Sequence, residues 1–64
     1  MKWTDVRAIA IELAESRPGV DPLTVRFTDL QQWVLDLPGF ADAPERCNER
    51  ILEAIQMTWV DERD

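Results

Sequence analysis

Two proline–glycine pairs divide this 64-residue chain into three segments, and they constrain its fold more than any other feature. Both residues end helices, so Pro18-Gly19 and Pro38-Gly39 predict breaks between successive elements. The first segment repeats apolar residues at helical spacing, which predicts a helix over residues 5–16 with Thr4 as its N-cap and Asp5 in its first turn. Its buried stripe is predicted to be Val6, Ile9, Ala10 and Leu13.

The second segment combines a strand pattern with a helix start. Residues 25–27 alternate apolar and charged side chains of β-favouring types, which favours one very short strand between the first two helices. Thr28 followed by Gln31 has the spacing of a capping box, so the second helix is predicted to begin there and to end before Pro38. Its apolar face is predicted to comprise Leu30, Trp33, Val34 and Leu37.

The third segment predicts the longest helix, which we expect to begin at residues 42–44 because Asp42 and Pro44 suit a helix start. Trp3 is expected to close over the end of the first helix. Three helices around one core, with one very short strand, predict a single all-α domain over residues 1–64 of the helix-turn-helix or winged-helix kind. The buried stripe of the third helix is predicted to be Cys47, Ile51, Ala54, Ile55, Thr58 and Trp59, with Leu52 at its edge.

Charge limits the partners of such a domain. The chain carries 13 acidic and 7 basic side chains and no histidine, for a formal net charge of −6. The excess lies in the second half, where residues 33–64 carry eight acids and three bases. This charge opposes binding to nucleic-acid phosphates and to anionic membrane surfaces, so the expected partner is a basic protein surface. A nucleic-acid-binding winged helix remains an alternative that the fold alone suggests.

The composition gives little support for catalysis, and we expect no enzyme. Cys47 is the one cysteine, and without histidine it lacks the usual base that would activate it. Cys47, Trp33 and Trp59 fall on predicted apolar stripes and are interpreted as core residues. A lone cysteine forms neither an internal disulfide nor a multi-cysteine zinc site, which is typical of the cytoplasm. No run approaches the ~18 consecutive apolar residues of a membrane span, and the first residues do not resemble a signal peptide.

Glu45, Glu49 and Glu53 are spaced four residues apart, which predicts a row of carboxylates along one face of the third helix. Like charges at this spacing destabilise a helix by about 0.2–0.5 kcal/mol per pair, and Arg46 and Arg50 are expected to relieve part of this by reaching a glutamate three residues on. A solvated helix face explains such a row as well as a binding site does. Carboxylate oxygens also suit hard cations such as magnesium, calcium, manganese or iron, so weak, exchangeable metal binding is the most that this chemistry predicts.

Five segments carry a family resemblance: KWTD (residues 2–5), DP (21–22), TVRFTDLQQW (24–33), NERILEAI (48–55) and WVDE (59–62). Together they resemble the IscX family, also called YfhJ, whose members are small acidic proteins associated with bacterial iron–sulfur cluster assembly. The resemblance implies a modified winged-helix fold, docking on the cysteine desulfurase of the assembly machinery, and competition there with bacterial frataxin. It also implies low-affinity iron binding (Fe²⁺ or Fe³⁺) with no tightly bound cofactor. A dedicated iron donor, instead of a regulator, stays open as an alternative.

Residues of this chain can be assigned to these roles. Asp29 also has a structural interpretation, because it lies in the first turn of the second helix. Ala41 and Ala43 stand in a stretch that we expect to be more acidic in the family, which argues against a dense metal site in that loop. We expect the protein to be a monomer. The candidate docking residues are Asp36, Glu45, Glu49, Glu53, Asp61 and Glu62. The candidate iron ligands are Asp5, Asp29, Glu49 and Glu53.

Overall fold

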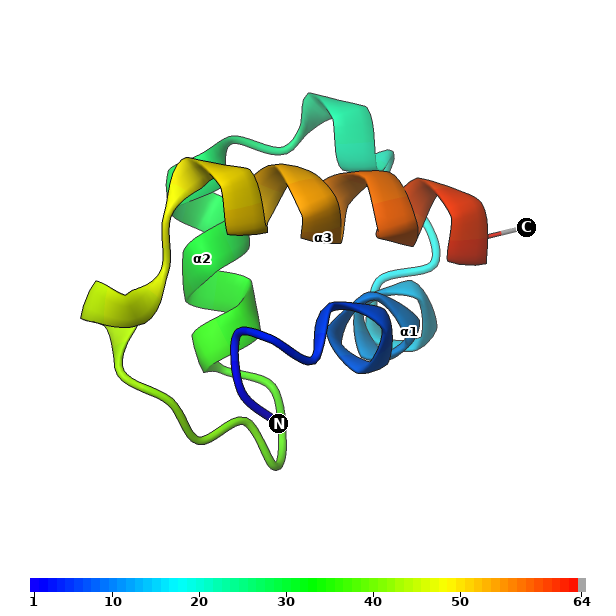
Figure 1. The fold of residues 1–64 in the computed structure, drawn as a ribbon. Coiled ribbons are helices and arrows are strands. Elements are labelled where there is room, and N and C mark those ends of the chain that lie inside the picture. The colour runs from blue at the N-terminus through cyan, green and yellow to red at the C-terminus, as the bar shows by residue number, and fades with distance from the viewer. Residues whose placement is uncertain (64) are drawn as a thin grey trace.

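The computed structural model describes residues 1–63 and contains three α-helices and two short 3₁₀ turns (Figure 1). The elements in chain order are α1 (Val6–Ser16), η1 (Pro22–Thr24), α2 (Phe27–Leu35), η2 (Pro44–Arg46) and α3 (Glu49–Glu62). Figure 1 shows α3 lying across the other two helices, and α1 and α3 make the most extensive contact between elements. The prediction of an all-α fold with three helices is confirmed.

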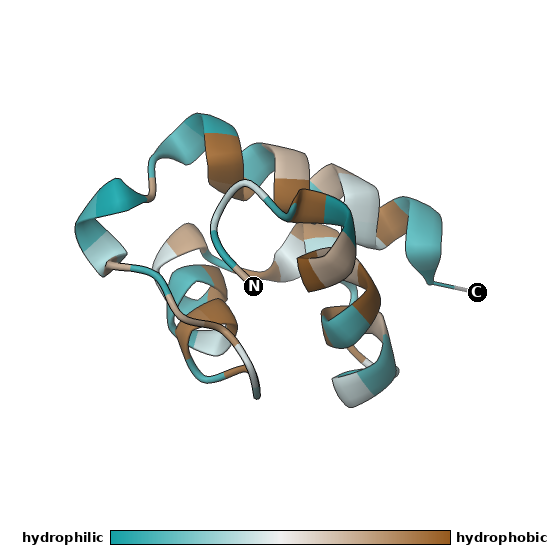
Figure 2. Cartoon of the chain, turned by 60° about the horizontal axis from the view of Figure 1, so that its bottom comes forward, coloured by the Kyte–Doolittle hydropathy of each residue, from teal (hydrophilic) through white to brown (hydrophobic). Residues whose placement is uncertain are grey.

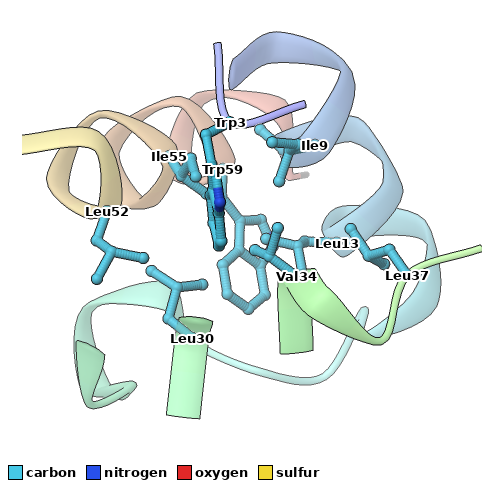
Figure 3. Packing of buried hydrophobic residues seen from close by; sticks show 10 residues of the cluster. Trp3, Ile9, Leu13, Leu30, Val34, Leu37, Leu52, Ile55 and Trp59 are labelled. Atoms are coloured by element: carbon cyan, nitrogen blue, oxygen red, sulfur yellow. The ribbon is translucent and has the colours of Figure 1, made fainter. Parts of the chain in front are cut away.

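The core lies where the three helices face one another. Hydrophobic residues gather on these inward surfaces, whereas η2 and the C-terminal end of α3 are hydrophilic (Figure 2). In Figure 3, Trp59 of α3 lies among side chains contributed by α1 and α2. Each large apolar side chain that is fully buried contributes about 1.5–3 kcal/mol, so this cluster is the main source of stability. Its buried members are Trp3, Ile9, Ala10, Leu13, Leu30, Val34, Leu37, Leu52, Ile55 and Trp59.

Helix α1 follows the prediction closely. Ile9, Ala10 and Leu13 are fully buried, and Val6 packs against the core from its edge. The predicted N-cap is wrong, because Asp5 and not Thr4 occupies that position. The Asp5 carboxylate accepts a hydrogen bond from the Lys2 backbone N–H (2.9 Å) instead of capping the helix.

The predicted strand at residues 25–27 is wrong. Val25 and Arg26 do have extended backbones, but no strand exists within residues 1–63 to pair with them, and Phe27 already begins α2. The described part of the chain therefore contains no strand from which a wing could be built. The capping box at Thr28 is also wrong, since the Gln31 amide donates instead to the Pro44 carbonyl (3.1 Å).

Helix α3 begins at Glu49, later than predicted, because Asn48 caps it. The Asn48 side-chain oxygen accepts a hydrogen bond from the Ile51 N–H (2.9 Å), which satisfies a backbone donor that the first turn leaves free. Residues 44–46 form the separate turn η2. Asp42 and Pro44 therefore do not start the helix.

The buried stripe of α3 is turned relative to the prediction. Leu52, Ile55 and Trp59 are buried, whereas Ala54 is exposed and Thr58 is half-buried. Both stripes fit helical spacing, and the observed one removes the larger Leu52 side chain from water. Cys47 is half-buried against the core, in agreement with its interpretation as a packing residue.

Trp3 joins the N-terminal segment to the loop between α2 and η2. Only 1% of Trp3 is exposed, and its indole Nε1–H donates to the Ala43 carbonyl (2.8 Å). Its ring also meets Phe40 edge to face, with 4.7 Å between ring centroids. The loop reaches this position through Gly39, whose φ of +80° favours glycine. Trp3 therefore fixes a loop 40 residues away, a contact that no local pattern indicated.

Candidate functional site

The exposed side of α3 carries a row of residues at four-residue intervals. Three are carboxylates, Glu49, Glu53 and Asp61, and the fourth is Met57. Residues four apart are neighbours on a helix surface, so these side chains form one slowly winding line that faces solvent. Within residues 1–63 none of the three carboxylates forms an ion pair. We call these four residues the α3 acidic row.

Three other predicted docking residues lie apart from this row. Asp36 is the exposed C-cap of α2, and its carboxylate accepts a hydrogen bond from the Gln32 amide (3.1 Å). Glu45 lies in η2 and not in α3, so the predicted ridge of three glutamates along one helix is wrong. Glu62 turns toward α1, where it pairs with Arg7 at 3.3 Å, so part of its charge is compensated within the molecule.

Asp42 is a structural carboxylate. Its side chain is only 9% exposed and accepts hydrogen bonds from the backbone N–H groups of Trp3 (3.1 Å) and Ala43 (2.8 Å). The Trp3 N–H holds the pKa of Asp42 below its ordinary value of 3.8, aided by Ala43 and the charge of Arg46 and opposed by burial. Arg46 lies 3.9 Å from Asp42, so the prediction that Arg46 would pair with a glutamate of the third helix is wrong.

The four candidate iron ligands lie at the starts of three different helices. Asp5 is the N-cap residue of α1, Asp29 lies in the first turn of α2, and Glu49 and Glu53 occupy the first two turns of α3. Acidic side chains near a helix N-terminus stabilise it by about 0.3–1 kcal/mol, which gives Asp5, Asp29 and Glu49 a role without any metal. Across residues 1–63, no three carboxylate or thiol side chains come together in a group that could hold a metal ion. Iron binding at these positions stays a prediction.

Cys47 and a small pocket also lie in the described part of the chain. Burial raises the pKa of the Cys47 thiol above its ordinary value of 9.0, so the unreactive protonated form prevails at neutral pH. A pocket of about 250 Å³ opens between the ends of α1 and α3, below the usual size of a ligand site. It is lined by Ala14, Glu15, Pro18, Glu62 and Arg63.

No helix in residues 1–63 combines the length and apolarity needed to cross a bilayer.

Comparison with known proteins shows which family this chain resembles. The chain matches, over residues 1–64, the model of a family described as "Iron-sulphur cluster assembly". An uncharacterized protein of Pseudomonas aeruginosa is 58% identical over 64 residues, which cover 100% of this chain and 97% of that protein. Both matches extend through α1, α2 and α3. The chain therefore belongs to the iron–sulfur cluster assembly family, which is also called IscX or YfhJ.

Proposed function

We propose that this protein is an acidic accessory and regulatory protein of iron–sulfur cluster assembly that docks on the cysteine desulfurase through the α3 acidic row. The observation that carries the proposal is the row itself, with Glu49, Glu53 and Asp61 exposed and free of ion pairs within residues 1–63. No internal ion pair has to break before these carboxylates meet a basic surface. Because the chain belongs to the iron–sulfur cluster assembly family, we expect the basic surface on a protein of the assembly machinery.

The physical basis of docking is long-range attraction followed by short-range pairing. A net charge of −6 steers the protein toward a positive surface and raises the association rate. Each exposed ion pair contributes about 0.2–1 kcal/mol, so three pairs contribute about 0.6–3 kcal/mol. Salt screens the attraction over roughly 8 Å at physiological ionic strength, so the affinity should fall as salt is added.

Iron binding is the second part of the proposal. Glu49 and Glu53 lie one turn apart on the same exposed side of α3 and offer oxygen ligands to a weakly held, exchangeable Fe²⁺ or Fe³⁺. If the same carboxylates bind the desulfurase, iron and enzyme compete for them. An NMR titration with iron, with and without desulfurase, tests this competition. Chemical shifts of α3 that respond identically to iron in both samples would contradict it.

A regulator of this kind would share the cytoplasm with the desulfurase and compete with bacterial frataxin for the same basic region. Competition is expected because two acidic proteins would use the same positive charges. Displacement of labelled frataxin from the desulfurase measures it. Binding of both proteins at once, each with unchanged affinity, would contradict a shared site.

Charge reversal tests the docking surface directly. The double variant Glu49→Lys with Glu53→Lys changes the net charge from −6 to −2, because each reversal adds two positive charges. We expect isothermal titration calorimetry to show desulfurase binding weakened by about tenfold or more, since two attractive pairs become repulsive. The matched control reverses Glu12 and Glu15 of α1, which gives the same net charge on another helix. Unchanged affinity of the α3 variant, or an equal loss in the control, would contradict docking through α3.

A further inference from the structure

Two large apolar side chains are exposed in the described chain, and they belong to two elements that contact each other, α3 and η1. Met57 of α3 is 52% exposed and Leu23 of η1 is 62% exposed. The side-chain amide of Gln56 donates a hydrogen bond to the Pro22 carbonyl (2.8 Å), and these two residues directly precede Met57 and Leu23. Figure 1 shows η1 lying beside α3, and Pro22 is buried in this contact. The turn therefore holds Leu23 on the flank of the α3 acidic row.

Charged groups lie next to both apolar side chains. Glu53 and Asp61 stand one turn before and one turn after Met57, and both are exposed. Asp21, two residues before Leu23, lies 3.6 Å from Arg63. A single exposed apolar side chain is ordinary on a protein surface. An apolar pair with charged groups around it has the arrangement of a protein interface, in which apolar residues form the centre and charged residues form the rim.

We propose that Met57 and Leu23 are the apolar anchor of the docking surface, and that the anchor enters an apolar socket framed by lysine or arginine side chains on the partner. This inference rests on the proposed function, so the partner is the cysteine desulfurase. The charged rim requires a positively charged surface on the partner, because the carboxylates on both sides of Met57 need positive charges opposite them. A second copy of this chain is a poor occupant, since it would bring the same carboxylates against each other. The unbranched thioether of Met57 adapts to an irregular socket.

The anchor and the rim have different kinetic effects. Charged residues at the rim of an interface mainly set the association rate and its salt dependence. Apolar contacts are insensitive to salt screening and act mainly on the dissociation rate. Variants of the two groups should therefore separate in a kinetic measurement.

Surface plasmon resonance with immobilised desulfurase, repeated at several salt concentrations, tests the anchor. For Met57→Ala we expect binding about 4- to 12-fold weaker, because roughly half of the side chain remains to be buried in the complex. The loss should appear as faster dissociation, with the same dependence of affinity on salt as the wild type. Leu23→Ala should behave in the same way. Thr28→Ala, an exposed truncation on α2, is the matched control and should bind like the wild type.

The outcomes separate the anchor from the proposed function. Wild-type kinetics for both Met57→Ala and Leu23→Ala, together with weakened binding of the α3 charge-reversal variant, would overturn the anchor and leave docking through α3 intact. Failure of the wild-type protein to bind desulfurase would overturn the proposed function itself. A wild-type dimer in analytical ultracentrifugation that Met57→Ala converts to a monomer would assign the pair to self-association and overturn the anchor. Met57→Gln preserves the length of the side chain, and a loss equal to that of Met57→Ala would support an apolar contact.

Discussion

Two buried tryptophans differ in one hydrogen bond, and this difference gives a sharp test of the packing described above. Trp3 is 1% exposed and Trp59 is fully buried. The indole N–H of Trp3 donates to the Ala43 carbonyl at 2.8 Å, whereas the buried Nε1–H of Trp59 has no hydrogen-bond partner within the described residues. Replacing either residue with phenylalanine removes the same ring atoms and the same N–H. The packing losses of the two variants should therefore be similar.

The hydrogen bond should make Trp3→Phe the more destabilising variant. It leaves the Ala43 carbonyl without its donor, and such a bond contributes about 0.5–1.5 kcal/mol. Trp59→Phe instead removes an unsatisfied buried donor, a group whose burial costs about 1–3 kcal/mol. The free energy of unfolding should consequently fall by about 1.5–4.5 kcal/mol more for Trp3→Phe than for Trp59→Phe. A domain of this size is stable by only about 3–10 kcal/mol, so the difference is large on that scale.

Urea unfolding followed by far-UV circular dichroism measures the two losses. With a slope of about 1 kcal/mol per molar urea, the midpoints of the two variants should differ by about 1.5 M or more. Trp33→Phe is a useful third variant, because Trp33 is half-buried and its ring stacks under the Arg17 guanidinium at 3.9 Å. Equal midpoints for Trp3→Phe and Trp59→Phe, or a lower midpoint for Trp59→Phe, would refute this account of how Trp3 holds the loop.

Two further predictions concern the cap of α3 and the carboxylate at Trp3. Asn48→Ala should lower the free energy of unfolding by about 1 kcal/mol, because the Ile51 N–H loses its acceptor; Asn48→Asp, which keeps the acceptor, should retain wild-type stability in the same urea titration. The pKa of Asp42 is lower in the folded protein than its ordinary value of 3.8, so its contribution to stability is present above 3.8 and is lost as the pH falls through the folded-state value. Asp42→Asn should therefore make unfolding less dependent on pH below 3.8 than in the wild type, and an unchanged acid profile would contradict this role.

Much of the fold could be predicted because periodicity and helix breakers are local properties. The extent of α1 and its buried residues agree with the spacing of apolar side chains up to Pro18-Gly19. The start of α3 could not be read in the same way, since Asp42, Pro44 and Asn48 are all plausible caps by residue type. The Asp42 carboxylate accepts a hydrogen bond from the backbone N–H of Trp3, 39 residues away in the sequence. Asn48 therefore caps the helix.

The candidate site was predictable only in part for the same reason. Spacing placed Glu49 and Glu53 on one face, which α3 confirms, but it also placed Glu45 there because the helix was expected to begin earlier. The α3 surface also includes Met57, which the spacing of the carboxylates did not indicate. Leu52, Ile55 and Trp59 form the buried stripe of α3, and Met57 lies on the opposite side of the helix.

We propose that the exposed carboxylates of α3 bring this protein to a basic partner, the cysteine desulfurase. The most direct measurement is the affinity of the wild-type protein for purified desulfurase across a series of salt concentrations. We expect tight binding in dilute buffer and a steady loss of affinity as salt rises, with the charge-reversed α3 variant showing a weaker salt dependence. Binding that does not change with salt, or no binding in dilute buffer, would contradict it.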